Sequence, residues 1–309
     1  MQKVKNQIKP FLKWAGGKGQ LLDKFNSYYP NDLKTGNIKN YFEPFLGGGA
    51  VLLNVLQQFD IKKATVYDIN KNLILTWRTV QQHVDALIEI LETLQKKYHS
   101  LSTENRKEFY YKKREQFNYN GHKINYLNID ADSIQHAADI IFLNKTCFNG
   151  LFRFNSKGEF NVPMGRYKNP KILDAENLQL VSDLIKNVTI KNSEFTGVES
   201  DLVSDSFVYF DPPYRPLSNT SSFTAYSNSS FGDVQQKELG KLFNRIHLLG
   251  AKQMLSNSDP KNTNPEDTFF DDLYRDFNVF RIPAKRAINS VGGKRKPINE
   301  ILVTNYQVK

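Results

Sequence analysis

The hydrophobic and polar positions of the first 74 residues alternate between the pattern of strands and the pattern of helices. Short apolar runs at 41–42 and 64–67 predict strands, whereas residues 50–59 carry apolar side chains at the spacing of one helix face. Residues 21–25 predict an earlier helix behind a glycine turn. A strand, a glycine loop, a helix and a second strand that ends in an acidic residue are typical of a doubly wound α/β fold that binds a nucleoside-containing cofactor.

The pattern changes between residues 75 and 174. Amphipathic helices are expected at 84–94 and 134–143, and the polar, charge-dense stretch 106–128 between them matches no motif. Residues 151–162 alternate apolar and polar side chains around an Asn-Ser-Lys-Gly turn, which predicts a β-hairpin.

From Val188 the alternation of strands and helices returns. Strands are predicted at 188–191, 207–210, 252–255, 277–282 and 300–305. The helix expected between the second and third of these strands has Leu239, Leu242, Phe243, Ile246 and Leu249 on one face. A short basic loop around Gly292-Gly293 predicts that the last two strands pair antiparallel at the edge of the sheet.

Together these patterns predict one Rossmann-like α/β sheet, mostly parallel, with an antiparallel C-terminal edge pair. We expect residues 1–74 and 175–309 to form a discontinuous domain around this sheet. Residues 75–174 are then an inserted helical and β-hairpin domain.

Composition indicates a globular protein that acts on a polyanion. The 309 residues are 39% hydrophobic, and their formal net charge of +10 favours nucleic acid as the partner, although a basic surface can also serve solubility alone. The single cysteine, Cys147, is interpreted as a buried apolar residue and fits a reducing cytoplasm. The five histidines have no metal-ligand spacing, so we expect no metal site. Without a signal-peptide pattern or a membrane-length apolar run, the protein is expected to be soluble and cytoplasmic.

Asp211-Pro212-Pro213-Tyr214 follows the strand predicted at 207–210 and is expected to project from its carboxyl end. Because proline has no N–H, the carbonyls before and between the two prolines lack a local donor. A carboxylate, a free carbonyl and an aromatic face suit a planar amine, whose two hydrogens the acceptors take while the ring stacks on its face. The alternative is a proline-terminated strand whose Asp caps the next turn.

The glycine loop 43–49 can let the backbone approach a ligand closely where a strand gives way to a helix. It matches neither the dinucleotide fingerprint nor a phosphate loop, and a simple helix-packing turn is the alternative. Asp68, at the end of the next predicted strand, can accept hydrogen bonds from ribose hydroxyls. Its alternative role is the N-cap of the following helix.

Taken in their order along the chain, these motifs resemble those of the DNA adenine N6-methyltransferases of the Dam and DpnII type. These enzymes use S-adenosylmethionine and modify GATC. The similar segments, which span nearly the whole chain, are 11–18, 42–49, 68–70, 148–153, 160–167 and 211–214. The resemblance implies that the sheet is that of a methyltransferase and that 75–174 is a DNA target-recognition domain.

The resemblance implies S-adenosylmethionine as methyl donor and no metal. It implies that the cofactor is bound by Trp14, Lys18, Glu43, Phe45, Gly47, Asp68 and Asp211. It implies that the catalytic residues are Asp211, Pro212, Pro213 and Tyr214. Asp211 is expected to orient the amine and to stabilise charge, because a cationic product loses its proton without a strong base. The adenine must leave the duplex to reach this loop.

The resemblance also implies double-stranded DNA as partner, contacted by Lys13, Phe148, Asn149, Leu151, Arg153, Pro163 and Tyr167. Lys13 and Arg153 fall at base-reading positions, and Phe148 and Asn149 where side chains fill the gap left by the extruded base. A monomer is expected, and a restriction endonuclease acting on the same site, without direct contact, is compatible with this family.

Taken alone, these residues have simpler interpretations. Lys13 and Lys18 would be solvated, Trp14 and Tyr167 would be core aromatics, and Arg153 would be an exposed cross-strand partner. The basic tracts 112–114 and 294–296 would be solvated faces, although the net charge favours phosphate contacts.

Four other functions compete with DNA adenine methylation. A glutamine methyltransferase usually has Asn in place of Asp211, which argues against that class. Methylation of cytosine or of RNA adenine would keep most of the loop chemistry. A catalytically silent DNA-binding relative is disfavoured by the intact 211–214 and 43–49 motifs.

Overall fold

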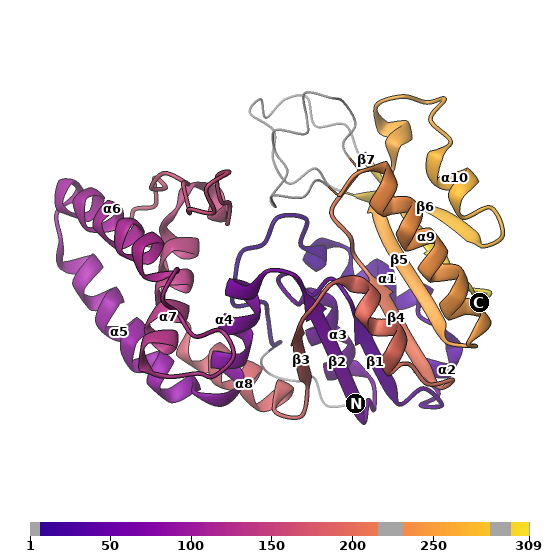
Figure 1. Ribbon diagram of the computed structural model, residues 1–309, viewed down its shortest axis with the longest axis horizontal. Helices are drawn as coiled ribbons and strands as arrows, with labels where there is room; N and C mark the ends of the chain where they lie inside the picture. Colours follow the sequence, from indigo (N-terminus) through magenta and orange to yellow (C-terminus); the bar gives the residue numbers. More distant parts are fainter. Residues whose placement is uncertain (1–6, 216–230, 285–297, 309) are drawn as a thin grey trace.

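The computed structural model describes residues 7–215, 231–284 and 298–308, and a seven-stranded sheet forms its centre (Figure 1). The strands within these residues are β1 (Asn40–Glu43), β2 (Lys63–Asp68), β3 (Thr189–Asn192), β4 (Ser206–Phe210), β5 (Lys252–Ser258), β6 (Asn278–Ala284) and β7 (Ile298–Thr304). Their order across the sheet is β3-β2-β1-β4-β5-β7-β6. Each strand coincides with one predicted from the sequence to within three residues at either end.

Strands β1 to β5 run parallel, and β7 pairs antiparallel with both β5 and β6. This confirms the mostly parallel sheet and its antiparallel edge pair. The chain moves outward from β1 through β2 to β3, then returns so that β4 lies on the other side of β1. The order therefore reverses between β1 and β4, and in open α/β sheets ligands bind outside the carboxyl ends at this point. Both loops singled out in the sequence, 43–49 and 211–214, leave the sheet there.

Alternate residues of the central strands build two separate apolar cores. Tyr41 and Tyr209 face one side, which is covered by α1 (Leu22–Tyr28) and α3 (Ala50–Gln58). Phe42 and Phe210 face the other, which is covered by α9 (Asp233–Leu248) and α10 (Phe269–Leu273). A sheet covered on both faces must present apolar side chains in both directions, which explains the continuous apolar run of β4.

The remaining helices gather beyond the β3 edge of the sheet (Figure 1). They are α4 (Lys71–Gln82), α5 (Val84–Ser100), α6 (Thr103–Asn120), α7 (Ala131–Thr146) and α8 (Ala175–Ile185). Helix α4 runs without a break across position 74/75, and one apolar cluster extends from the sheet through α4 into α5 and α7. The helical region therefore shares its core with the sheet.

The short elements are α2 (Asn31–Lys34) and the 3₁₀ turns η1 (Lys18–Gln20), η2 (Phe148–Gly150), η3 (Phe195–Asp201) and η5 (Pro260–Asn262). Within the described ranges, no helix is long and apolar enough to cross a membrane. The loop around Gly292-Gly293 and the tract 294–296 lie outside the described residues.

The hairpin predicted at 151–162 does not form a regular strand ladder. Phe154 and Phe160 make an isolated antiparallel bridge, and the Asn161 N–H donates to the Arg153 carbonyl at 3.4 Å. The backbone of Phe160 instead bonds at both N–H and C=O to the Asn118 side chain of α6. The segment is thus held by a helix behind it, which the local pattern could not indicate.

One further expectation was wrong, and one stretch without a prediction is helical. Leu249 is 52% exposed because α9 ends one residue before it, so it does not belong to the buried face. Residues 106–128, which matched no motif, mostly form α6, and this helix buries only Tyr110 and Phe117 fully. So few apolar contacts leave too weak a periodic signal to predict a helix.

Candidate active site

A buried lysine forms the centre of the site at the carboxyl end of β4. The Lys18 side chain is 2% exposed, and its ammonium donates to Asp211 Oδ1 at 2.6 Å, to the Gly16 carbonyl at 3.0 Å and to the Tyr214 hydroxyl at 3.2 Å. These three bonds use all three ammonium hydrogens. Lys18 is therefore not a solvated lysine, and it joins the N-terminal motif to the Asp-Pro-Pro-Tyr loop.

Glu300 on β7 completes this group of charges and was missed by the sequence analysis. The Tyr214 hydroxyl donates to Glu300 Oε1 at 2.8 Å, while Glu300 Oε2 lies 3.8 Å from the Lys18 ammonium and has no hydrogen-bond partner within the described residues. The one acidic residue of the strand 298–304 was the available signal.

Burial and the neighbouring charges have opposite effects on the pKa values of Lys18, Asp211 and Glu300. Burial acts to lower the pKa of Lys18, but Asp211, Tyr214 and Glu300 outweigh it and hold the pKa above its ordinary value. Burial raises the pKa of Asp211, and the Lys18 ammonium opposes that rise. Burial likewise raises the pKa of Glu300, again against the effect of Lys18. The ionised state of Asp211 thus depends on Lys18.

The Asp-Pro-Pro-Tyr loop leaves two acceptors free at this position. Ser256 Oγ donates to Asp211 Oδ1 at 3.3 Å, and Gln236 Nε2 donates to the Pro213 carbonyl at 3.1 Å. No described residue donates a hydrogen bond to Asp211 Oδ2 or to the Pro212 carbonyl. With the ring of Tyr214 38% exposed, the loop presents a carboxylate oxygen, a carbonyl and an aromatic face.

The glycine loop is fixed by two tryptophans. Gly47 and Gly49 have φ of +48° and +68°, a region that favours glycine. A Cβ at Gly47 or Gly48 would come within 2.9 Å of Trp14, and one at Gly49 within 2.4 Å of Trp77. The Trp77 indole also donates to the Gly47 carbonyl at 3.2 Å. Trp14 is half-buried and packs both on this loop and on the main apolar core.

Asp68 faces the same loop from the end of β2. Its Oδ2 accepts from the Gly47 N–H at 3.0 Å and its Oδ1 from the Asn70 N–H at 2.9 Å. The N-cap of α4 is Asn70, whose side chain accepts from Asn72 and Leu73, so the capping interpretation of Asp68 is wrong. Each Asp68 oxygen keeps a lone pair for a further donor. Burial raises the pKa of Asp68, and its two backbone donors oppose the rise.

Glu43 and Phe45 lie on either side of the start of this loop. The buried Glu43 accepts from the Tyr41 hydroxyl at 2.6 Å, and its pKa is raised well above the ordinary value, chiefly by burial. Phe45 is partly exposed and stacks on Phe195 of η3, with ring centroids 5.4 Å apart. The loop is therefore bordered by a buried carboxyl and an aromatic pair.

The residues predicted to contact DNA are anchored to the N-terminal motif. The Lys13 ammonium lies 4.2 Å from the Tyr167 ring centroid, and a Cβ at Gly150 would collide with the Lys13 side chain at 2.4 Å. Buried Asn144, which the sequence analysis missed, binds both the N–H and the carbonyl of Lys13 at 2.8 Å and also the Gly150 carbonyl at 3.2 Å. As one of several polar residues in α7, it belonged to no motif.

The other predicted DNA contacts project from the same segment. Phe148 is 46% exposed, and Asn149 is exposed and, among the described residues, the one non-glycine with positive φ, at +55°. Exposed Pro163 accepts the Phe148 N–H at 2.8 Å, and Leu151 is half-buried. The Arg153 Nε donates to Asn161 Oδ1 at 3.3 Å, as a cross-strand partner would, and the remaining guanidinium nitrogens bond no described residue.

The basic tract 112–114 serves partly to support this segment. Lys113 pairs with Asp139 of α7 at 3.1 Å, and the Arg114 guanidinium donates to the carbonyls of Asn161 and Val162. Lys112 alone is exposed. Two of these three cations therefore have structural partners and do not form a solvated face.

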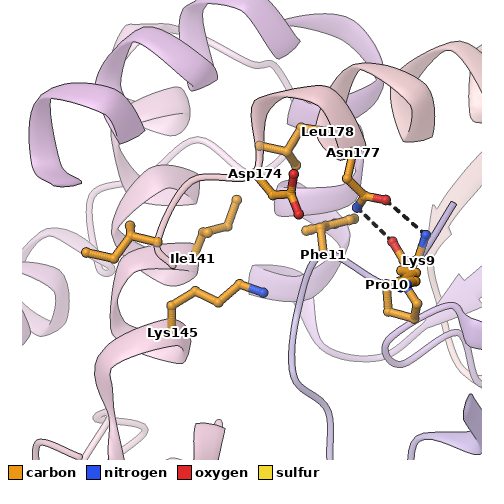
Figure 2. Close-up of a pocket in the computed structure, with 9 residues that line it drawn as sticks. Lys9, Pro10, Phe11, Ile141, Lys145, Asp174, Asn177 and Leu178 are labelled. Atoms are coloured by element: carbon orange, nitrogen blue, oxygen red, sulfur yellow. Dashed lines mark hydrogen bonds between the residues drawn. The ribbon is translucent and has the colours of Figure 1, made fainter. Parts of the chain in front are cut away.

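A separate cavity of about 140 Å³ lies between the N-terminal segment, α7 and α8 (Figure 2). The Asn177 side chain bonds the backbone of Lys9 beside it, and burial lowers the pKa of Lys145 to about 8, with Lys13 acting in the same direction. None of the predicted site residues lines this cavity. Among the described residues, no group of three or more His, Cys, Asp or Glu side chains could hold a metal ion.

Comparison with known proteins decides the family. The model of the D12 class N6 adenine-specific DNA methyltransferases matches residues 14–288. The chain belongs to this family. It is an enzyme that methylates adenine in DNA, as the motifs in the sequence predicted.

Individual relatives agree with this assignment. The chain is 51% identical to the type II methyltransferase M.MjaIII of Methanocaldococcus jannaschii, over 97% of this chain and 100% of that protein. It is 38% identical to the type II methyltransferase M1.LlaDCHI of Lactococcus lactis, over 99% and 98%, and 32% identical to the DNA adenine methylase of Escherichia coli, over 94% and 93%. A precorrin-8w decarboxylase structure with 9% identity, covering 89% of this chain and 86% of that one, has a TM-score of 0.33, too low to support an argument.

The dependence of Asp211 on Lys18 predicts a shift in the pH profile of Lys18→Met. Without the ammonium, no group of comparable strength opposes the effect of burial on Asp211. The pKa of Asp211 therefore rises, and a smaller fraction of this side chain is ionised at a given pH. The acid limb of the methylation rate, measured at saturating DNA and methyl donor, should move to higher pH. The matched control is Lys39→Met, which breaks an exposed pair with Asp60 (2.8 Å) and should leave the profile unchanged. An unshifted acid limb in Lys18→Met would contradict this dependence.

Proposed function

We propose that the enzyme transfers a methyl group from S-adenosylmethionine to the N6 amine of an adenine that has left double-stranded DNA, within GATC. The observation that carries this proposal is the pair of free acceptors, Asp211 Oδ2 and the Pro212 carbonyl, beside the exposed ring of Tyr214. Two acceptors and one π-face match the two hydrogens and the plane of an aromatic amine. Only a base outside the helix stack can meet all three groups together.

The roles of the acceptors follow from the electronic structure of adenine. Its amino lone pair is delocalised into the ring, so the nitrogen is a poor nucleophile. Hydrogen bonds from the amine to Asp211 and Pro212 favour a pyramidal nitrogen. Its lone pair is then no longer delocalised into the ring and can point at the methyl group to be transferred. Lys18 and Ser256 hold Asp211 in place, and Gln236 holds the loop through the Pro213 carbonyl. Asp211 thus orients the amine and stabilises the positive charge that develops on it.

We assign the cofactor to the loop that follows β1. We propose that Asp68 accepts hydrogen bonds from the ribose hydroxyls with its remaining lone pairs. Trp14, Lys18, Glu43, Phe45, Gly47 and Asp211 form the rest of the site. Gly47 and Gly48 allow the Trp14 side chain to pack directly on the backbone of this loop, because a Cβ at either position would collide with it. When bound, S-adenosylmethionine supplies a methyl carbon that is already electrophilic.

DNA recognition is proposed for the segment supported by α6 and α7. We assign the guanine-reading positions to Lys13 and Arg153, and assign Pro163 and Tyr167 to the same recognition element. Phe148, Asn149 and Leu151 would occupy the space left in the duplex. In this proposal 75–174 is the target-recognition domain, and 1–74 with 175–309 is the catalytic domain. The enzyme acts as a monomer, and a restriction endonuclease of the same specificity would not contact it.

Asp211→Ala should reduce methyl transfer by at least about a hundredfold, because the amine loses its charged acceptor. Transfer of a labelled methyl group from S-adenosylmethionine to a GATC duplex, followed by mapping of the modified base, measures this. Asp60→Ala, at an exposed carboxylate with two lysine partners, is the control for the substitution itself. Full activity in a correctly folded Asp211→Ala enzyme would refute the role of this loop.

Asp68→Ala should weaken S-adenosylmethionine binding by about 1.5–3 kcal/mol while leaving DNA affinity unchanged, because a charge-assisted pair of hydrogen bonds is lost. Calorimetric titration with the cofactor measures the change. Asn70→Ala removes the neighbouring N-cap of α4 without removing a carboxylate, so it reports the effect of loosening this region alone. Equal losses in the two variants would show that Asp68 only supports the loop.

Arg153→Ala should lose roughly 1–3 kcal/mol of discrimination at one base pair, because a guanidinium matches the two acceptors on the major-groove edge of guanine. Methylation rates on GATC and on its single-base variants give this discrimination. Lys112→Ala, an exposed cation on α6, should instead leave the ratios between sequences unchanged. If Arg153→Ala slows methylation of all sequences equally, the residue does not read a base.

A further inference from the structure

Glu300 is a buried acid that the proposed chemistry does not yet use. Its side chain is 12% exposed, and one of its oxygens has no hydrogen-bond donor among the described residues. Burying a carboxylate, and leaving part of it unbonded, costs free energy, and such groups occur mainly at functional sites. A role in fold stability alone would be served better by an apolar residue at this position.

The position of Glu300 in the sheet places its side chain next to the Asp-Pro-Pro-Tyr loop. It lies on β7 opposite Ser258 of β5, and Ser258 is on the same face of β5 as Ser256. Ser256 bonds Asp211, so two adjacent strands send polar side chains to the two ends of the Asp-Pro-Pro-Tyr loop. Ser256 holds the first residue of the motif, and Glu300 holds the last.

The hydrogen bonds have a single consistent direction through this group. Lys18 donates to the Tyr214 hydroxyl at 3.2 Å, and that hydroxyl donates to Glu300 Oε1 at 2.8 Å. Since Lys18 has already used its other hydrogens on Asp211 and Gly16, none remains for Glu300 Oε2, which explains the 3.8 Å separation. The hydroxyl of Tyr214 is therefore held from both sides, although the ring is 38% exposed.

We propose that Glu300 is a positioning residue that acts through the Tyr214 hydroxyl to fix the ring on which the target adenine stacks. A ring attached only through its Cβ can rotate, whereas a ring anchored at both ends presents one face. The proposal rests on the stacking of the extruded base on Tyr214. Its consequence is that β7, at the antiparallel edge, determines the geometry of a loop that follows β4.

Four variants test this anchor: Glu300→Leu, Glu300→Gln, Tyr214→Phe and the double variant Tyr214→Phe/Glu300→Leu. Glu300→Leu and Tyr214→Phe remove opposite ends of one hydrogen bond, so each should slow single-turnover methylation by about tenfold or more. The KM for the methyl donor should stay within about twofold of the parent value. The double variant should be no slower than the slower single variant, because the second change has no bond left to remove. Glu300→Gln keeps an oxygen that accepts from the hydroxyl, so it should restore most of the rate lost in Glu300→Leu.

A fluorescent signal separates positioning from folding. With 2-aminopurine in place of the target adenine, base extrusion raises the emission and stacking on Tyr214 quenches it. In Glu300→Leu and in Tyr214→Phe, the 2-aminopurine should still leave the duplex, but its emission should be quenched less than in the parent enzyme. The parent enzyme provides the control for the proposed function: no methylation of adenine and no emission change there would overturn that function, whatever the variants do.

Two results would overturn the role of Glu300 alone. One is additive losses of rate in the double variant, which would mean that the two side chains act independently. The other is a Glu300→Gln enzyme as slow as Glu300→Leu, which would assign the effect to charge and not to the bond with Tyr214. Tyr214→Phe leaves β7 unchanged, so the test remains possible even if a Glu300 variant unfolds. Unquenched 2-aminopurine emission in Tyr214→Phe would support the anchor. A Tyr214→Phe enzyme with the rate and the quenching of the parent would refute it.

Discussion

The burial of the Lys18 ammonium is the constraint on which the active site depends. A charged group removed from water is stable only when it is fully hydrogen-bonded and paired with opposite charge. Lys18 meets this requirement with a carbonyl of its own turn, a carboxylate from the loop after β4 and a hydroxyl that β7 holds in place. Three segments far apart in the sequence must therefore come together before the lysine can be buried, and their meeting assembles the catalytic loop.

One short segment near the N-terminus connects every part of this methyltransferase. Lys13 contacts the recognition segment through Tyr167 and Gly150, Trp14 packs on the glycine loop, and Lys18 binds Asp211. Because these residues are neighbours in the chain, a shift at one contact displaces the others. The proposed base-reading, cofactor-binding and catalytic groups thus share a short connection, and buried Asn144 holds it at Lys13.

Residues 148–167, the proposed recognition segment, show how a surface loop can be positioned without regular secondary structure. Its backbone groups bond to side chains of α6, chiefly Asn118, Tyr110 and Arg114, in place of a strand partner. A charge-dense helix of weak amphipathic pattern is suited to this purpose, since it offers polar side chains on the face that the loop covers. Phe148 and Asn149 are exposed on this segment, whose backbone α6 holds in place.

Sequence patterns alone predicted the strands, five of the ten α-helices found in the described residues, the antiparallel edge pair and the reaction. The elements follow from apolar periodicity, which is local information, whereas the reaction was implied by the resemblance of several motifs, in their order along the chain, to those of DNA adenine methyltransferases. Tertiary structure decided the partners of Lys18, the anchoring of Tyr214 by Glu300, the replacement of a hairpin ladder by bonds to α6, and the N-cap role of Asn70 in place of Asp68. These contacts join residues whose own segments of the sequence do not indicate which partner they take. Which of two plausible hydrogen-bond partners a polar group takes depends on distances that only the packed sheet and helices establish.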